Sequence, residues 1–126
     1  MSNETDKAVS LDEKFALFDD HWSPKVIAQC NGQLVKLAKG KGELIWHKHD
    51  NEDELFFVHK GRLTLKFRDR EIVLNPGELF VVPRGVEHCP LAEEETEILL
   101  FEPAGTAHTG EHSTEQTVAS EDQPWI

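Results

Sequence analysis

Three histidines and one glutamate are spaced so that they can share one metal ion. His47 and His49 are two residues apart on a predicted strand, so both imidazoles project from the same face of that strand. Glu54 follows after a polar turn, and a hairpin there would bring its carboxylate back beside the two histidines. His88 comes later, just past a Pro-Arg-Gly turn, and can complete the set from the end of another strand. These four side chains are the predicted metal ligands.

This donor set suits a divalent transition metal. Neutral imidazoles and a carboxylate bind ions of borderline hardness, and zinc, iron, manganese and nickel all accept such a set. We therefore predict one such ion as the cofactor, with its identity left open. An octahedral ion in this site would keep positions open for water, oxygen or a chelating small molecule, and it could polarise an oxygen ligand or lower the pKa of bound water. No acid or base stands out beyond the ligands themselves, so the catalytic residues stay unknown at this stage.

The other histidines are predicted to lie outside this site. Strand alternation places His59 on the face opposite Glu54, so its side chain points outward or into an interface. His21 is expected at the surface, as are His108 and His112 in the polar carboxy-terminal segment.

The stretch 10–18 predicts a short amphipathic helix that lies on the main body. Ser10 and Glu13 form a capping-box pattern, and apolar residues then recur at helical spacing as far as Phe18. The residues before this stretch are polar, and they are expected to form a mobile tail.

From Pro24 onward the sequence predicts antiparallel β-structure. Asn31-Gly32 lies between two apolar runs and is the strongest hairpin signal in the chain, and Asn75-Pro76-Gly77 is typical of a second turn. About eight short strands with no helix between them indicate a sandwich or a barrel. The expected strands span residues 26–28, 34–38, 43–49, 54–59, 63–67, 71–74, 79–82 and 97–101.

Several of these strands are apolar on both faces, such as 55–58 and 98–101. One face can fill the barrel with side chains such as Ile45, Phe56 and Val58. The other face must be covered by something else. The amino-terminal helix and a second subunit are the candidates, and we expect a homodimer.

Composition narrows the class of protein. A chain of 126 residues fits one domain, and its net charge of −11, from 13 basic and 24 acidic residues, repels nucleic acids and anionic membranes. We therefore expect no nucleic-acid or membrane partner. No apolar run approaches the roughly 18 residues that cross a bilayer. The polar, acidic amino terminus is unlike a signal peptide, so we expect a cytoplasmic protein.

The spacing of the predicted ligands resembles the first motif of the cupin family. That motif is a glycine, five residues, His-any-His, three or four residues, Glu, six residues and a second glycine. His47, His49, Glu54 and Gly61 fit it. The opening glycine is displaced, since the glycines nearest to its place are one residue too close to His47 and one too far.

The second cupin motif is also present. It is a glycine, five residues, Pro-any-Gly, two residues, His, three residues and Asn. Gly77, Pro83-Arg84-Gly85 and His88 fit this motif. Ala92 stands where the family has Asn, which is a departure away from the ligands.

The resemblance covers roughly residues 33–102. It implies an all-β fold, the antiparallel double-stranded β-helix or jelly-roll barrel, here with a short amino-terminal helix. It also implies that His47, His49, Glu54 and His88 bind the metal. The expected organisation is a tail and short helix over 1–22, the cupin barrel over 23–103, and a loosely ordered tail over 104–126. The run 46–103 further resembles small bacterial cupins of the RmlC-like superfamily that are called mannose-6-phosphate-isomerase-like.

Three functions are compatible with these features. The first is a metal-binding cupin of unassigned reaction, such as a dioxygenase or an isomerase, that acts on or binds a small molecule. The second is a non-catalytic, metal-stabilised binding or sensing module, which the lack of an evident acid or base favours. The third is a phosphosugar isomerase, which needs a basic phosphate cradle. For that cradle the sequence offers Lys60, the only lysine predicted to point inward, and Arg84 near the expected mouth of the barrel.

Overall fold

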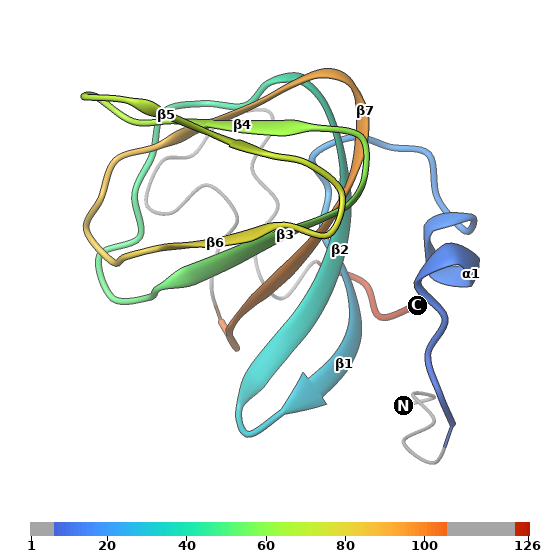
Figure 1. Cartoon of the computed structure of the whole chain (residues 1–126). Helices are drawn as coiled ribbons and strands as arrows, with labels where there is room; N and C mark the ends of the chain where they lie inside the picture. Colours follow the sequence, from blue (N-terminus) through green and yellow to red (C-terminus); the bar gives the residue numbers. More distant parts are fainter. Residues whose placement is uncertain (1–6, 106–122) are drawn as a thin grey trace.

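The computed structural model describes residues 7–105 and 123–126. Nearly all regular structure in this part is β-sheet, with one short helix before it (Figure 1). The all-β prediction with an amino-terminal helix is therefore confirmed. The elements are α1 (Leu11–Phe15), β1 (Lys25–Cys30), β2 (Gln33–Glu43), β3 (Glu54–Lys60), β4 (Leu63–Lys66), β5 (Glu71–Leu74), β6 (Leu79–Val82) and β7 (Cys89–Pro103).

The strands form one antiparallel sheet that curls into a barrel (Figure 1). Its main path is β1-β2-β7-β3-β6, and β4 joins it by pairing with both β5 and β7. The long strand β7 links the two parts, because its first residues pair with β4, its later residues pair with β3, and β2 pairs with it from Leu91 to Pro103. This arrangement is the jelly roll that the sequence predicts.

Local sequence signals explain how the chain begins. The Ser10 hydroxyl accepts a hydrogen bond from the Glu13 backbone N–H at 3.3 Å, so Ser10 caps α1 as predicted. The helix ends at Phe15 rather than Phe18. Both phenylalanines are nevertheless buried, in a cluster with Ile27 and Leu37 on β1 and β2. Thus α1 covers part of the outer face of the sheet.

The β1–β2 hairpin follows from its turn residues. Asn31 and Gly32 have φ values of 52° and 77°, the two consecutive positive values that a type I′ turn requires. β2 then runs farther than predicted, to Glu43.

The predicted strand 43–49 is wrong. β2 ends at Glu43, after a pairing irregularity between Gly40 and Gly42, where Gly42 adopts a φ of 81°. Beyond this break the chain pairs only locally, through an isolated antiparallel bridge between His47 and His88. Residues 7–105 and 123–126 therefore form seven strands rather than about eight.

The same break changes which residue enters the barrel. Leu44 is buried in the core, whereas Ile45, the predicted interior residue, is half-buried. The other two predicted interior residues, Phe56 and Val58, are confirmed in the core. The barrel core is apolar, and its buried members are Trp22, Ala38, Leu44, Phe56, Val58, Leu63, Leu65, Phe67, Leu74, Val82, Ala92, Ile98 and Leu100.

The end of the chain lies against the barrel. Of the segment 104–126 that was predicted as a loose tail, residues 123–126 return to β1. The Val26 N–H donates to the Pro124 carbonyl at 2.7 Å, and the Ile126 N–H donates to the Val26 carbonyl at 3.0 Å. His108 and His112 lie outside the described residues. Within the described part of the chain, no helix is long and apolar enough to cross a membrane.

Candidate metal centre

The four predicted ligands meet inside the barrel. His47 and His49 lie in the segment after β2, Glu54 is the first residue of β3, and His88 directly precedes β7. One ligand atom from each side chain lies within 4.8 Å of the others. All four residues are buried, the most exposed being His49 at 3%. This is a buried His/Glu cluster that could hold a metal ion.

Two of the histidines are oriented by backbone carbonyls. Nδ1 of His47 lies 2.8 Å from the Ile45 carbonyl oxygen, and Nδ1 of His88 lies 3.0 Å from the Val86 carbonyl oxygen. A carbonyl oxygen can only accept, so each Nδ1 carries the proton and donates it. Each Nε2 then keeps a free lone pair, which is the arrangement that metal-binding histidines use.

Several of the converging atoms have no hydrogen-bond partner within residues 7–105 and 123–126. They are Nε2 of His49, Nε2 of His88 and Oε1 of Glu54. Oε1 of Glu54 lies 3.3 Å from His49 Nε2 and 3.6 Å from His88 Nε2, without hydrogen-bond geometry. Buried polar atoms rarely go without a partner, and each such atom costs about 1–3 kcal/mol. A bound divalent metal ion would satisfy all three atoms at once, so the donor set fits such an ion.

The environment also affects the charge of the histidines. Burial, together with the nearby His88, lowers the pKa of His47 to about 4, so its ring is neutral near pH 7. For His49, burial acts in the same direction, but the carboxylates of Glu54 and Glu52 outweigh it and raise the pKa. The neutral ring is the form that binds metal.

A second buried ionisable pair lies behind Glu54. Nζ of Lys36 on β2 lies 2.9 Å from Oε1 of Glu102 on β7, and both side chains are 0% exposed. Burial and the adjacent Glu54 carboxylate raise the pKa of Glu102 well above its usual range. Burial also opposes ionisation of Glu54, but its interactions with Glu102, His49 and His88 outweigh burial and hold its pKa well below its usual range. The negative charge of this carboxyl pair therefore favours Glu54 over Glu102.

Sequence reasoning missed this pair. It predicted Lys60 as the inward lysine, but Lys60 is exposed, because the pairing of β3 with β7 shifts between Val58 and Lys60. A signal for the buried pair was present. Lys36 alternates with the core residue Ala38, and Glu102 lies two residues after the core residue Leu100.

Arg84 does not contribute to the cluster. Its side chain is 66% exposed and pairs with Asp53 at 3.5 Å, and its backbone N–H donates to the same carboxylate at 2.8 Å. His59 lies on the outward face, as strand alternation predicts, where its ring stacks on Phe15 with centroids 5.5 Å apart. Its Nε2 also lies within hydrogen-bond distance of Asp12 Oδ1, at 2.9 Å.

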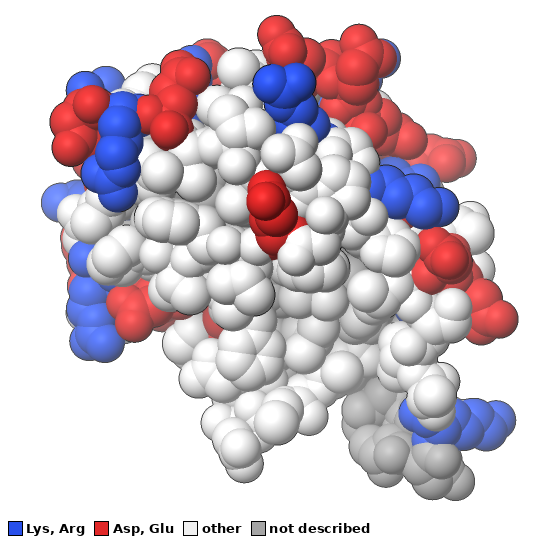
Figure 2. Space-filling view, in the orientation of Figure 1, with Lys and Arg blue, Asp and Glu red and all other residues white. Residues whose placement is uncertain are grey.

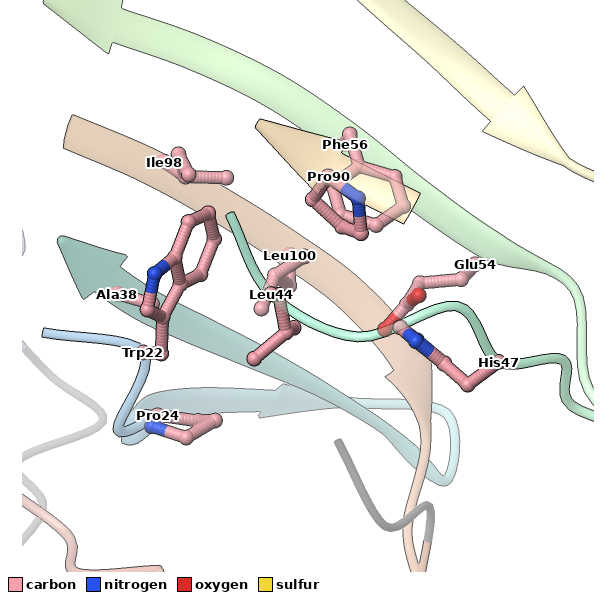
Figure 3. Close-up of a pocket in the computed structure, with 10 residues that line it drawn as sticks. All are labelled: Trp22, Pro24, Ala38, Leu44, His47, Glu54, Phe56, Pro90, Ile98 and Leu100. Atoms are coloured by element: carbon pink, nitrogen blue, oxygen red, sulfur yellow. The ribbon is translucent and has the colours of Figure 1, made fainter. Parts of the chain in front are cut away.

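A pocket leads from the cluster into the apolar barrel (Figure 3). The cavity itself measures about 20 Å³, and the space around it comes to about 370 Å³ when the open solvent at its mouth is counted. Its lining residues are Trp22, Pro24, Ala38, Leu44, His47, Glu54, Phe56, Pro90, Ile98 and Leu100. Within the described part of the chain, His47 and Glu54 are the only ionisable residues of this lining, and both lie at the cluster. The site thus combines a group of metal-type donors with an uncharged cavity.

Comparison with known proteins gives a consistent result. Residues 33–102 match the cupin domain family. The chain is 34% identical over 99 residues to the uncharacterized protein YdbB of Bacillus subtilis strain 168, covering 78% of this chain and 80% of that protein. It is 48% identical to a cupin-2 domain containing protein from Shewanella frigidimarina, with a TM-score of 0.75 over 76% of this chain and 94% of that structure.

A more distant structure shares the fold alone. Hydroquinone 1,2-dioxygenase PnpCD in complex with Fe3+ is 20% identical, with a TM-score of 0.69. The match covers 78% of this chain and 32% of the dioxygenase chain.

Proposed function

The chain belongs to the cupin family, and from this premise we propose that it binds one divalent transition metal through His47, His49, Glu54 and His88 and holds a small molecule beside that ion. The observation that carries the proposal is the convergence of buried Nε2 and Oε1 atoms that lack hydrogen-bond partners in the described residues. Zinc, iron, manganese and nickel are the candidate ions. When bound, such an ion would act as a Lewis acid on an oxygen atom of the small molecule.

The protein's own groups prepare the site for this role. The Ile45 and Val86 carbonyls hold the His47 and His88 rings with Nε2 toward the cluster. Burial keeps His47 neutral, and Glu54 supplies the negative charge that offsets a cation. Away from His47 and Glu54, the described residues of the pocket lining offer water no hydrogen-bonding side chain except the indole N–H of Trp22, which is bonded to the Lys41 carbonyl.

Metal analysis tests this proposal. Protein purified without chelators or an affinity tag is expected to carry about one equivalent of metal by mass spectrometry. His88→Ala and Glu54→Gln should lose most of that metal. His21→Ala is the matched control, because His21 is partly exposed and contacts Glu95 away from the cluster. Metal that survives both site substitutions would refute the assignment.

A catalytic role and a pure binding role remain distinct alternatives. The fold-level likeness to a dioxygenase makes oxygen chemistry the first reaction to assay with the iron-loaded protein. Oxygen uptake with an enolic or catecholic compound would support a dioxygenase. The absence of any uptake, with a large metal-dependent rise in melting temperature, would support a binding or sensing module.

The pocket gives little support to a phosphosugar isomerase. A phosphate group needs cationic side chains or a cluster of backbone N–H donors. No lysine or arginine of the described residues lines the pocket, and Lys60 and Arg84 are both exposed. Interconversion of mannose and fructose 6-phosphates by the zinc-loaded protein would instead support a phosphosugar isomerase.

We further propose that the protein is a cytoplasmic homodimer. α1 covers the outer face only near β1 and β2, and Leu79 and Val81 on β6 remain 56% and 44% exposed. Figure 2 shows a broad area of mainly uncharged side chains in this orientation, with one acidic side chain near its middle and most charged side chains toward its rim. An uncovered apolar face of this kind favours self-association.

A further inference from the structure

Trp22 forms the end of the pocket opposite the candidate metal ligands. It precedes the part of the chain that matches the cupin domain, residues 33–102. Figure 3 shows its indole at one side of the pocket and Glu54 and His47 at the other, with Leu44 and Leu100 between them. Trp22 is only 8% exposed, so most of its surface is covered by the protein.

The backbone holds Trp22 in an unusual conformation. Its φ is 55°, a value that bulky residues rarely adopt and that costs free energy unless the surroundings enforce it. Two hydrogen bonds to β2 enforce it here. The Trp22 N–H donates to the Lys39 carbonyl at 2.7 Å, and the indole Nε1 donates to the Lys41 carbonyl at 3.0 Å.

Gly40 provides the space for the indole between these two hydrogen bonds. A Cβ atom at Gly40 would lie 2.6 Å from Cη2 of Trp22, which no side chain can tolerate without movement. The single polar atom of the indole is already bonded to Lys41, so the ring presents hydrocarbon to the pocket. The local structure therefore fixes the ring at one place along the pocket.

We propose that Trp22 is a specificity-determining residue that sets the length of the ligand. The ligand class is a small molecule with one anionic oxygen-bearing head and a short uncharged hydrocarbon body. Its head would lie at the His47 and Glu54 end and its body would reach toward Trp22. This inference rests on the proposed function, because the head needs the metal-binding end of the pocket.

The lining explains why the body must be apolar. Leu44, Phe56, Ile98 and Leu100 offer no hydrogen-bonding side chain, so hydroxyl groups of a sugar would be buried beside them without partners. A hydrocarbon chain has no hydrogen bonds to lose there. Each methylene that it buries should strengthen binding about fourfold.

A series of carboxylates tests the proposal on the zinc-loaded protein. Acetate through octanoate would be titrated by calorimetry. Affinity should rise about fourfold per methylene and should stop rising at the acid whose chain reaches the indole, which defines the length limit, or stop, of the pocket. Trp22→Ala should move this stop to longer acids, and Gly40→Ala, which displaces the ring, should also move it. Trp46→Ala is the control, because Trp46 lies under the Arg68 guanidinium and is not part of the pocket lining.

The outcomes separate this inference from the metal proposal. An affinity that does not depend on chain length, or a stop that is the same in wild type, Trp22→Ala and Gly40→Ala, overturns the role of Trp22. Protein that takes up no zinc overturns the metal proposal instead. Neutral n-alcohols, followed by fluorescence of a Trp46→Phe/Trp125→Phe protein that retains Trp22, then give the length profile without metal. If Trp22→Ala does not fold, as judged by circular dichroism, Trp22→Phe should move the stop by a smaller amount.

Discussion

His47 is a residue whose protonation should be visible in the stability of the metal-free protein. Its pKa is lowered to about 4 in the native state, against an ordinary value of 6.5. Between these values the unfolded chain binds a proton that the native chain does not. The contribution of His47 to the free energy of unfolding is therefore fully present above pH 6.5. It is lost as the pH drops toward 4, by a total of about 3 kcal/mol.

Urea denaturation of chelator-treated protein at pH 7 and pH 4 checks this prediction. His47→Asn removes the titrating ring while an amide can still donate to the Ile45 carbonyl, so the variant should lose less stability on acidification than wild type. His49 has a raised pKa and contributes in the opposite direction, but it is present in both proteins. Equal losses in the two proteins would show that another group is responsible.

The buried Lys36–Glu102 pair predicts strong coupling between two substitutions. Lys36→Met leaves the Glu54 and Glu102 carboxyl groups buried without their cation, which should cost about 3–5 kcal/mol of unfolding free energy. In Lys36→Met/Glu102→Leu the second carboxyl group is gone as well, so the double variant should be more stable than Lys36→Met alone. Denaturation of the wild type, both single variants and the double variant gives the coupling energy, and strictly additive costs would contradict it.

For single residues, the sequence predicts which side chains lie together where their spacing along the chain is enough to bring them close. His47, His49, Glu54 and His88 were chosen from spacing and motif, and the structure places their ligand atoms together. Trp22 was not foreseen, because its place depends on a positive φ and on hydrogen bonds to a distant strand. Such contacts have no local periodicity to reveal them.

Among the elements, the turn between β3 and β4 depends on a glycine for two separate reasons. Gly61 has a φ of 93°, and a Cβ there would lie 2.5 Å from Thr96 Oγ1 and 2.9 Å from Thr96 Cα. Gly77, in the turn before β6, has a similar φ of 86° but nothing within 4 Å of such a Cβ. Comparing substitutions in the two turns therefore separates the cost of backbone strain from the cost of steric overlap.

Alanine substitutions should reflect this difference. Gly77→Ala should cost about 1–2 kcal/mol through backbone strain. Gly61→Ala should cost about 1–3 kcal/mol more, because Thr96 is 0% exposed and its backbone cannot move away. Chemical denaturation of the two variants provides the measurement, and equal losses would mean that β7 yields to the added methyl group.

The elements themselves were partly predictable, since alternation and turn residues identify most strands. The errors occur where long-range pairing overrides local pattern. The last strand was expected over residues 97–101 only, yet β7 spans Cys89–Pro103 and includes the acidic residues 93–95, whose side chains are exposed to water. The stretch after β2 looked like a strand, but β2 ends at Glu43 and the backbone beyond it pairs only through the His47–His88 bridge.

For the whole molecule, the outer face near β6 is the feature that bears on assembly. β6 lies at the end of the main strand path, and an apolar strand at a sheet edge favours pairing with another chain. Leu79 and Val81 are exposed there, and their pairing partners on β3, Phe57 and Leu55, are only half-buried. Helix α1 and the docked residues 123–126 lie against β1 and β2 instead. Association through the β6 side would thus cover apolar side chains that α1 and residues 123–126 leave exposed.

Leu79→Glu tests this association without touching the metal cluster. Each copy would lose the burial of one leucine and would face a like charge across a two-fold axis, so the dimer dissociation constant should rise on the order of 100-fold or more. Leu17→Glu is the matched control, because Leu17 is 64% exposed but lies beside α1. Sedimentation velocity over a range of concentrations should show a wild-type and Leu17→Glu dimer and a Leu79→Glu monomer, all with equal metal content. A monomeric wild type, or a dimer unaffected by Leu79→Glu, would show that the protein does not dimerise through the β6 side.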